Sequence, residues 1–389
     1  MKRVALKKNE DHRITKGHPW VFSNEIASID GSPEPGDIVH LHNHAGKFLG
    51  IGFFNPRSLI AVRLLTSHDE PIERGFFQRK IVSALALRKK LFPDSETFRL
   101  IHGESDLLPG LIVDKYEDLL AVQILSAGME RQIPLVCDIL EELLHPRGIV
   151  ERNDVPVRTL EGLELRKGIL RGSYEPPVIV EGNLRYALDL LEGQKTGFFL
   201  DQRENRFAIR RYARNMSVLD CFCNDGGFSL NAASGGAHSV VGIDISETAV
   251  GRAGENARRN NLSDSVSFIC SDVFDYLRHA VDEKKAFDLI ILDPPSFTKS
   301  KKSVHKALRG YREINSLALK MLKSRGILAT ASCSHHIFPE KFLETVQGSA
   351  REENKTLSLL EWRGASPDHP VLPAMPETVY LKFGIFCVQ

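Results

Sequence analysis

The stretch that decides the fold is SVLDCFCNDGG, residues 217–227, in which a short apolar run ends in an acid and a glycine-containing loop. The run at 217–220 is typical of a buried strand, and the loop leads into a helix. Similar apolar runs follow at residues 239–244, 266–269, 287–292 and 326–331. Helical segments such as 247–260 and 311–322 lie between them. This alternation predicts an α/β domain built on a mainly parallel sheet.

The end of the chain follows a different pattern. Two further strands are expected at residues 357–362 and 378–386, joined by a proline-rich turn at 367–376 that carries no helix signal. Strands connected in this way predict an antiparallel pair at one edge of the sheet, unlike the parallel crossovers before it.

The first half of the chain is predicted to form two smaller domains. Residues 1–68 contain short apolar runs, such as 38–41 and 59–65, broken by turn residues, which indicates a β-rich module. Residues 69–180 combine helices at 76–91 and about 130–144 with several strands, which indicates a mixed α+β domain. With residues 181–389 as the α/β domain, we expect three domains, as a length of 389 residues allows.

Composition narrows the class of protein. The net charge of +1 gives no overall field toward nucleic acid, so any such binding needs a local basic patch. The basic start at residues 1–8 lacks the apolar core of a signal peptide, and no apolar run is long enough to cross a membrane. The six cysteines are scattered without metal-ligand spacing. We therefore expect a cytoplasmic protein with reduced thiols, no metal site and no membrane partner.

Acids stand at the ends of the first three predicted strands. Asp220 precedes a loop that lacks the Gly-x-Gly-x-x-Gly pattern of dinucleotide sites, and Asp244 follows about 20 residues later, where an acid commonly binds ribose hydroxyls. Asp272, before Val273, is placed to hold an adenine amino group. Each acid alone is equally explained as a helix N-cap. Together they favour an adenosine-containing ligand without a diphosphate.

The last two parallel strands end in chemically distinctive residues. The fourth leads into DPPSF, 293–297, where the prolines fix an extended backbone and present Asp293 rigidly at the sheet edge. The fifth leads into SCSHH, 332–336, which places Cys333 at the same edge. A buried structural thiol is the alternative for Cys333. His335 and His336 are candidates to activate the thiol or to cap the next helix.

Basic residues follow the DPPSF motif directly and would lie on the edge that carries Asp293 and Cys333. They are Lys299, Lys301, Lys302, Lys306, Arg309 and Arg312. Such a run is often only a solvated face, but beside a base-modifying site it predicts phosphate contacts. A second candidate patch, on weaker grounds, is a predicted helix with Arg203, Arg206, Arg210, Arg211 and Arg214.

These motifs together resemble the class I S-adenosylmethionine-dependent methyltransferases. The segment KTGFFLDQRENR (195–206), the pieces HGE (102–104) and LPGLIVD (108–114), and GHPWVF (17–22) extend the resemblance to the bacterial 23S rRNA cytosine-C5 methyltransferase family. The last of these resembles its N-terminal PUA domain, an RNA-binding module. The chain departs from the family where Asn224 and Asp225 replace a usual Tyr-Thr pair.

The resemblance implies a Rossmann-like domain with a mostly parallel seven-stranded sheet, preceded by a PUA domain and a small α+β central domain. It also implies methyl transfer from S-adenosylmethionine to a cytosine C5 of 23S rRNA, with Cys333 as nucleophile, Asp293 on the base, and a possible homodimer. The residues expected at the cofactor are Gln202, Arg203, Asp220, Phe222, Gly226, Asp244, Ser246, Asp272, Val273 and Asp293. The alternatives are a guanine or adenine nitrogen methyltransferase, which needs no thiol, and a non-catalytic RNA-binding assembly factor.

Overall fold

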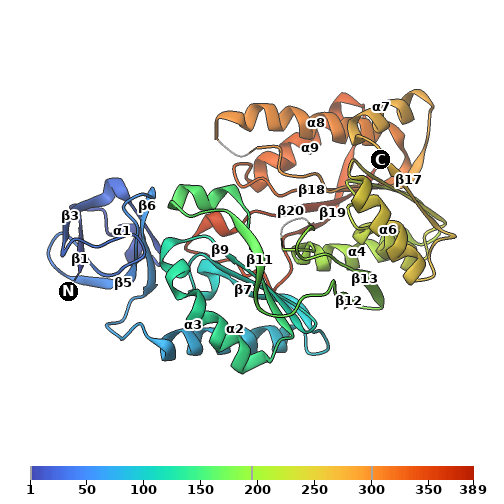
Figure 1. Ribbon diagram of the computed structural model, residues 1–389. Coiled ribbons are helices and arrows are strands. Elements are labelled where there is room, and N and C mark those ends of the chain that lie inside the picture. Colours follow the sequence, from blue (N-terminus) through green and yellow to red (C-terminus); the bar gives the residue numbers. More distant parts are fainter. Residues whose placement is uncertain (1, 194–195, 299–300) are drawn as a thin grey trace. The chain divides into compact units, whose positions relative to one another are not determined.

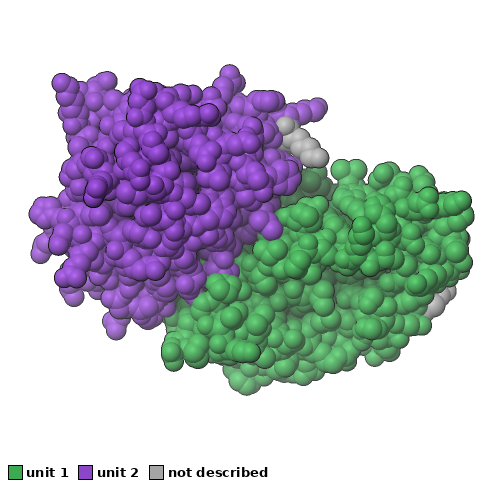
Figure 2. Space-filling view, turned by 180° about the vertical axis from the view of Figure 1, so that it is seen from behind, with its two compact units in different colours: residues 1–179, 188–200, 367–378 green, residues 180–187, 201–366, 379–389 purple. Residues whose placement is uncertain are grey.

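The computed structural model describes residues 2–193, 196–298 and 301–389 (Figure 1). The chain forms two compact units, coloured separately in Figure 2. Unit 1 contains residues 1–179, 188–200 and 367–378, and unit 2 contains residues 180–187, 201–366 and 379–389. Two short segments that lie beyond residue 187 therefore belong to unit 1. The division into three sequential domains stays a prediction.

The N-terminal part of unit 1 is a six-stranded sheet with a core of its own. Val4, Leu6, Val21, Val39 and Val62 are fully buried in it. The strand order is β2 (Trp20–Phe22), β6 (Ile60–Thr66), β5 (Phe48–Phe54), β4 (Ile38–His42), β1 (Arg3–Leu6) and β3 (Ile26–Asp30), and helix α1 spans His12–Thr15. The strands predicted at 38–41 and 59–65 are confirmed.

The second sheet of unit 1 is five-stranded and is flanked by two helices. Its order is β11 (Arg166–Gly172), β10 (Gly148–Asn153), β9 (Leu119–Ile124), β8 (Leu111–Tyr116) and β7 (Thr97–His102), with helices α2 (Arg74–Leu91) and α3 (Ala127–Leu144). Both predicted helices are confirmed and begin two to three residues earlier than expected. Apolar side chains such as Phe77, Ile81 and Met129 bury the helices against this sheet.

The proline-rich turn after residue 366 belongs to unit 1 because a buried arginine holds it there. Arg88, on α2, is fully buried, and its guanidinium donates to both carboxylate oxygens of Asp106 and to the carbonyl of Asp368. The Asp368 carboxylate in turn accepts from the backbone N–H of Arg99, at 2.9 Å. Buried charges need such partners, so these bonds fix the turn in place.

Unit 2 is built on a seven-stranded sheet in the order β16 (Val266–Cys270), β15 (Ser239–Asp244), β14 (Ser217–Cys221), β17 (Phe287–Leu292), β18 (Leu322–Ser332), β20 (Lys382–Val388) and β19 (Leu357–Arg363). The first five strands are parallel to one another, whereas β20 runs antiparallel to both β18 and β19. The predicted parallel sheet and antiparallel edge pair are confirmed. A small two-stranded sheet, β12 (Val178–Glu181) and β13 (Leu184–Ala187), precedes it.

Helices cover both faces of this sheet, with α7, α8 and α9 on one face and α4 and α6 on the other (Figure 1), and α5 packs against α4. They are α4 (Arg203–Ala213), α5 (Gly227–Ser234), α6 (Glu247–Arg259), α7 (Val273–Asp282), α8 (Val304–Met321) and α9 (Pro339–Glu352). Short 3-10 helices lie at Ser23–Glu25, Gly103–Asp106, Pro156–Glu161, Leu200–Gln202, Lys301–Ser303 and Pro376–Thr378. In the described ranges, none of the helices has the length and apolarity that a membrane span requires.

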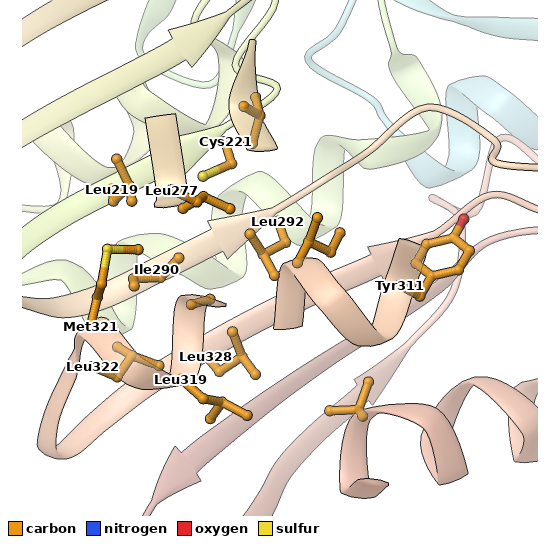
Figure 3. Packing of buried hydrophobic residues seen from close by; sticks show 14 of the residues in the cluster. Leu219, Cys221, Leu277, Ile290, Leu292, Tyr311, Leu319, Met321, Leu322 and Leu328 are labelled. Atoms are coloured by element: carbon orange, nitrogen blue, oxygen red, sulfur yellow. The ribbon is translucent and has the colours of Figure 1, made fainter. Parts of the chain in front are cut away.

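The core of unit 2 lies between β14, β17, β18 and the helices α7 to α9. Leu219, Ile290 and Leu328 from the central strands pack with Leu319 and Tyr311 of α8 (Figure 3). Helix α8 begins seven residues earlier than the segment predicted at 311–322, because Ala307 and Leu308 also pack on this core. A rigid apolar core thus fixes the strand ends that carry the predicted site.

Candidate active site

The predicted site residues meet at the carboxyl edge of the seven-stranded sheet. In the parallel register, Cys221 of β14 lies beside Ile243 of β15 and Leu292 of β17. Asp244 comes directly after Ile243, and Asp293 comes directly after Leu292, so the two acids lie level with each other at this edge. The strand order reverses between β14 and β17, and ligands of open α/β sheets bind at such a switch point.

The loop after β14 has an unusual backbone conformation. Phe222 and Asn224 have φ values of 65° and 46°, in the left-handed region that a bulky residue such as phenylalanine rarely adopts. The loop is held there by two bonds to β15: the N–H of Cys223 donates to the Ile243 carbonyl at 3.0 Å, and that of Asn224 donates to Asp244 at 2.9 Å. Residues held in this way cluster at ligand sites.

Asp244 organises the loops on both sides of it. Its second oxygen accepts from the N–H of Ser246 at 2.9 Å, and the Ser246 hydroxyl caps α6 by accepting from the N–H of Ala249 at 3.3 Å. The Asp244 carboxylate is therefore fixed at the strand end with a lone pair still available on each oxygen. This geometry suits the hydroxyls of a ribose.

Asp220 is a fully buried carboxyl with unused bonding capacity. One oxygen accepts from the Ser229 hydroxyl at 2.6 Å, while the other has no hydrogen-bond partner among the described residues. Burial raises the pKa of Asp220 to about 7, and the bond from Ser229 opposes this rise. An unsatisfied buried oxygen is costly, so a ligand amino group that donates to it would be bound favourably.

The rest of the glycine loop has a packing role. Gly226 has a φ of 83°, and a Cβ there would lie 3.0 Å from the Phe268 ring, so only glycine fits. Asp225, one of the two residues that depart from the family pattern, forms a 2.8 Å ion pair with Arg252 of α6. Burial nevertheless raises the pKa of Asp225 to about 6. The departure is thus accommodated by an internal ion pair.

Asp272 is the N-cap of α7, which confirms the alternative interpretation of this acid as a helix cap. Its side chain accepts from the N–H of Asp275 at 3.1 Å, and the residue is exposed, whereas Val273 is buried. A capping carboxylate has a second oxygen that can bind a ligand, so the predicted adenine contact stays a prediction.

Gln202 connects the segment before β14 to the DPPSF loop. Its amide N–H donates to Asp293 at 2.8 Å, and its carbonyl oxygen accepts from Asn205 at 2.6 Å. Gln202 and Asn205 are buried, so they hold one Asp293 oxygen in a fixed orientation.

Two of the arginines of α4 do not lie on the basic surface predicted for this helix. Arg203 and Arg206 are 3% and 2% exposed, and both donate to Glu181 of β12, Arg206 through two bonds of 2.7 and 2.5 Å. Arg210 donates to Asn231 and Asn183, and Arg211 pairs with Glu361. The predicted phosphate-binding patch on this helix is wrong for Arg203 and Arg206, because their guanidinium groups are buried against a carboxylate.

Cys333 lies beside the DPPSF loop, with its Sγ 3.8 Å from the carbonyl oxygen of Pro294. The residue is partly exposed, and its neighbour Ser334 is fully buried. The Ser334 hydroxyl lies 2.9 Å from the Tyr311 hydroxyl and 3.0 Å from that of Ser296. Sequence reasoning missed this hydroxyl cluster, because it joins three segments with no shared pattern.

Neither histidine after Cys333 caps the next helix. The N-cap of α9 is Phe338, and its side chain makes no capping bond. The ring of His335 instead packs 5.4 Å from that of Tyr380. The helix-cap alternative is therefore wrong, and activation of the thiol by a histidine stays a prediction.

The candidate RNA-binding residues of α8 lie on its outer face. Lys306, Arg309 and Arg312 are exposed, whereas Tyr311 of the same helix is buried, and Lys302, in the 3-10 helix Lys301–Ser303 before α8, is exposed as well. Arg312 pairs with Glu352 of α9 at 3.2 Å. Lys299 lies outside the described residues, as does the side chain of Lys301. Arg309, Arg312 and Lys320 of α8, with Glu352, line a hollow of about 280 Å³.

Comparison with known proteins agrees with this geometry. A family model described as S-adenosylmethionine-dependent methyltransferase matches residues 169–382, and one described as PUA-like domain matches residues 4–67. The chain is 39% identical over 392 residues to ribosomal RNA large subunit methyltransferase I of Alteromonas mediterranea, covering 99% of this chain and 98% of that protein. It is 41% identical to the same-named protein of Aliivibrio fischeri, with the same coverage.

Solved structures share the whole fold at low identity. An S-adenosylmethionine-dependent methyltransferase structure from Streptococcus mutans matches with a TM-score of 0.86 at 20% identity, and a methyltransferase complexed with SAH matches with 0.87 at 20%. Both alignments cover 100% of each chain. The chain belongs to the S-adenosylmethionine-dependent methyltransferases, and within them to the ribosomal RNA large subunit methyltransferase I family.

Proposed function

We propose that this protein transfers a methyl group from S-adenosylmethionine to C5 of a cytosine in 23S rRNA, through a covalent adduct of Cys333. The observation that carries the proposal is the position of the Cys333 thiol, 3.8 Å from the Pro294 carbonyl in the loop that presents Asp293. A nitrogen methyltransferase needs the acid and the prolines but has no use for a thiol there. The names of the relatives support ribosomal RNA as the substrate.

The cofactor half of the site is assigned to the ends of β14, β15 and β16. The unsatisfied oxygen of Asp220 would accept from the amino group of S-adenosylmethionine, and Asp244 would accept from its ribose hydroxyls. The exposed Asp272 would accept from the adenine amino group. When bound, the cofactor supplies an electrophilic sulfonium methyl group. The carboxyl groups match the donors of that molecule, so the site fits it.

The base half of the site is assigned to the ends of β17 and β18. The Cys333 thiolate adds to C6 of the cytosine, which makes C5 nucleophilic enough to accept a methyl group. Loss of the C5 proton to a base, with the electron pair expelling the thiolate, then restores the ring. Asp293, oriented by Gln202 at 2.8 Å, holds the N3 and N4 edge and in its protonated form donates to N3.

RNA must deliver an unstacked base to this edge, because the reacting carbon is inaccessible inside a stack. The exposed Lys302, Lys306 and Arg309 precede or lie on α8, which follows the Asp293 loop in sequence. They are assigned to phosphate contacts. The PUA-like domain is assigned to RNA binding beyond the modified nucleotide. The cytoplasmic location expected from the composition, and the homodimer that the resemblance implies, stay predictions.

Mass mapping of methylated nucleotides in 23S rRNA, from cells with and without this protein, tests the substrate. A 5-methylcytosine that disappears with the protein and returns with the wild-type chain is expected. Cys333→Ala should lower methyl transfer by at least about a thousandfold, as removal of a nucleophile does. Cys387→Ala, a partly buried cysteine at the other end of β18 and β20, is the matched control. Full activity of Cys333→Ala, or a methylated purine nitrogen, would overturn the proposal.

A further inference from the structure

Lys382 is a buried lysine at the edge that carries Cys333. It is the first residue of β20 and lies opposite Ser332, the last residue of β18, in the antiparallel register. Because the two strands run in opposite directions, the start of β20 meets the end of β18, one residue before Cys333. The side chain is 1% exposed.

The ammonium group of Lys382 is held by backbone oxygens. Its Nζ donates to the carbonyl of Ser334 at 2.8 Å and to that of Tyr380 at 2.7 Å. Among the described residues, no carboxylate forms an ion pair with it, and Cys333 is the side chain whose ionised form would act on the pKa of Lys382. Burial lowers the pKa of Lys382 to about 8, and a Cys333 thiolate acts against that decrease.

A buried cation without a counter-ion is costly, and an apolar side chain of similar size would fill the same space at less cost. Two carbonyl groups offset part of this cost but do not neutralise the charge. The buried ammonium group is stabilised when a neighbouring group loses a proton and becomes an anion. The thiol of Cys333 is the neighbouring group that can do this.

We propose that Lys382 is a positioning residue for the covalent step, whose ammonium group, held by the carbonyls of Ser334 and Tyr380, stabilises the thiolate of Cys333. A cation beside a thiol lowers the pKa of the thiol and raises the fraction of nucleophile at neutral pH. That this effect speeds methyl transfer rests on the proposed function, whereas the effect of Lys382 on the Cys333 thiol does not.

Other titratable groups surround Cys333 and enter its pH dependence. They are Tyr311 on α8, whose pKa a Cys333 thiolate raises, Asp293, which precedes the Pro294 that Cys333 contacts, and His335 and His336, which follow Cys333 closely in the chain. Burial raises the pKa of Tyr311 to about 12, so its hydroxyl stays neutral near pH 7 and adds no charge. His335 is exposed and His336 is partly exposed, whereas Lys382 is buried, so water screens the charge of Lys382 less than that of either histidine.

The test is the rate of Cys333 alkylation by iodoacetamide as a function of pH, followed in the full chain by mass spectrometry of the Cys333 peptide. Lys382→Gln keeps a donor for the two carbonyls but removes the charge. We expect it to slow alkylation at pH 7 by about tenfold or more and to move the profile to higher pH, since a neighbouring cation lowers a pKa by about 1 to 3 units. Lys382→Arg should retain most of the wild-type rate.

The exposed Cys270 provides an internal control, because its alkylation should be the same in every variant. Lys382→Met is the second neutral variant and repeats the test should the glutamine fail to fold. An unchanged Cys333 profile in the folded neutral variant would overturn the inference.

Methylation assays separate this inference from the proposed function. In Lys382→Gln we expect kcat to fall at pH 7 and to recover as the pH rises, with an unchanged KM for RNA. Full activity of Cys333→Ala would reject the proposed function and leave the alkylation result standing. An inactive Cys333→Ala with an unmoved alkylation profile in Lys382→Gln would reject only the role of Lys382.

Discussion

Helices α4 and α8 are both rich in basic residues, and in sequence both are candidates to bind RNA. In the structure, Arg203 and Arg206 of α4 are buried against the Glu181 carboxylate. On α8, Lys306 and Arg309 are exposed, on the face opposite the core. The difference shows that a basic helix can serve folding or binding. A guanidinium buried against a carboxylate of another segment stabilises the fold, whereas an exposed cation stays accessible to RNA even where it forms a surface ion pair.

The largest effect is expected from removing the carboxylate of Glu181, to which the buried arginines of α4 donate. Glu181→Gln removes the negative charge to which both buried arginines donate, and we expect a loss of about 3 to 5 kcal/mol in the free energy of unfolding. Chemical denaturation measures it. Glu352→Gln, which breaks the exposed pair with Arg312 on α8, is the matched control and should change stability by less than about 1 kcal/mol. Equal effects of the two substitutions would remove the distinction between the helices.

The second prediction extends the comparison to a buried acid that lacks a cation. Burial raises the pKa of Asp220 to about 7 in the folded protein, from an ordinary value of 3.8. Its contribution to stability is therefore fully present below about pH 4 and is lost as the pH rises to 7, by up to about 1.4 kcal/mol per pH unit. Asp220→Asn should flatten this decrease in unfolding experiments across pH 4 to 7. The exposed Asp264→Asn should leave the decrease intact, and a wild-type-like decrease in Asp220→Asn would contradict the assignment.

A smaller effect is expected on RNA affinity when exposed cations of α8 are removed. Lys306→Ala and Arg309→Ala should weaken binding of a 23S rRNA fragment, each reducing the slope of log affinity against log salt by about 1. Fluorescence anisotropy at several salt concentrations measures this slope. Arg211→Ala on α4, also exposed but paired with Glu361, should leave the slope unchanged. A reversed order would place the RNA on α4.

The smallest effect tests whether Glu352 competes with phosphate for Arg312. Its ion pair is exposed and weak, so Glu352→Gln should raise RNA affinity by about twofold at low salt, with no gain at high salt. The same anisotropy assay detects this change, and Glu340→Gln, an exposed acid on the same helix, controls for the change in net charge. A gain of equal size in the control would assign the effect to overall charge.

The sequence by itself determined the parallel sheet, the strand ends, and the residues that stand at them. Asp220, Asp244, Asp293 and Cys333 follow apolar runs directly, and the carboxyl ends of parallel strands always meet at one edge. This information is local, because hydrophobic periodicity and turn residues within a few positions specify each strand and its end.

Only the tertiary structure decided which buried charges have partners. Glu181 reaches Arg206 from 25 residues away, Arg88 binds Asp368 from 280 residues away, and Lys382 reaches the residue after Cys333 from 48 residues away. No local pattern encodes these meetings, because they depend on strand order and on how segments fold back on each other. Burying a charge costs free energy unless a partner compensates it, so the partner determines whether the charge stabilises the fold. The partner is known only once the chain is folded.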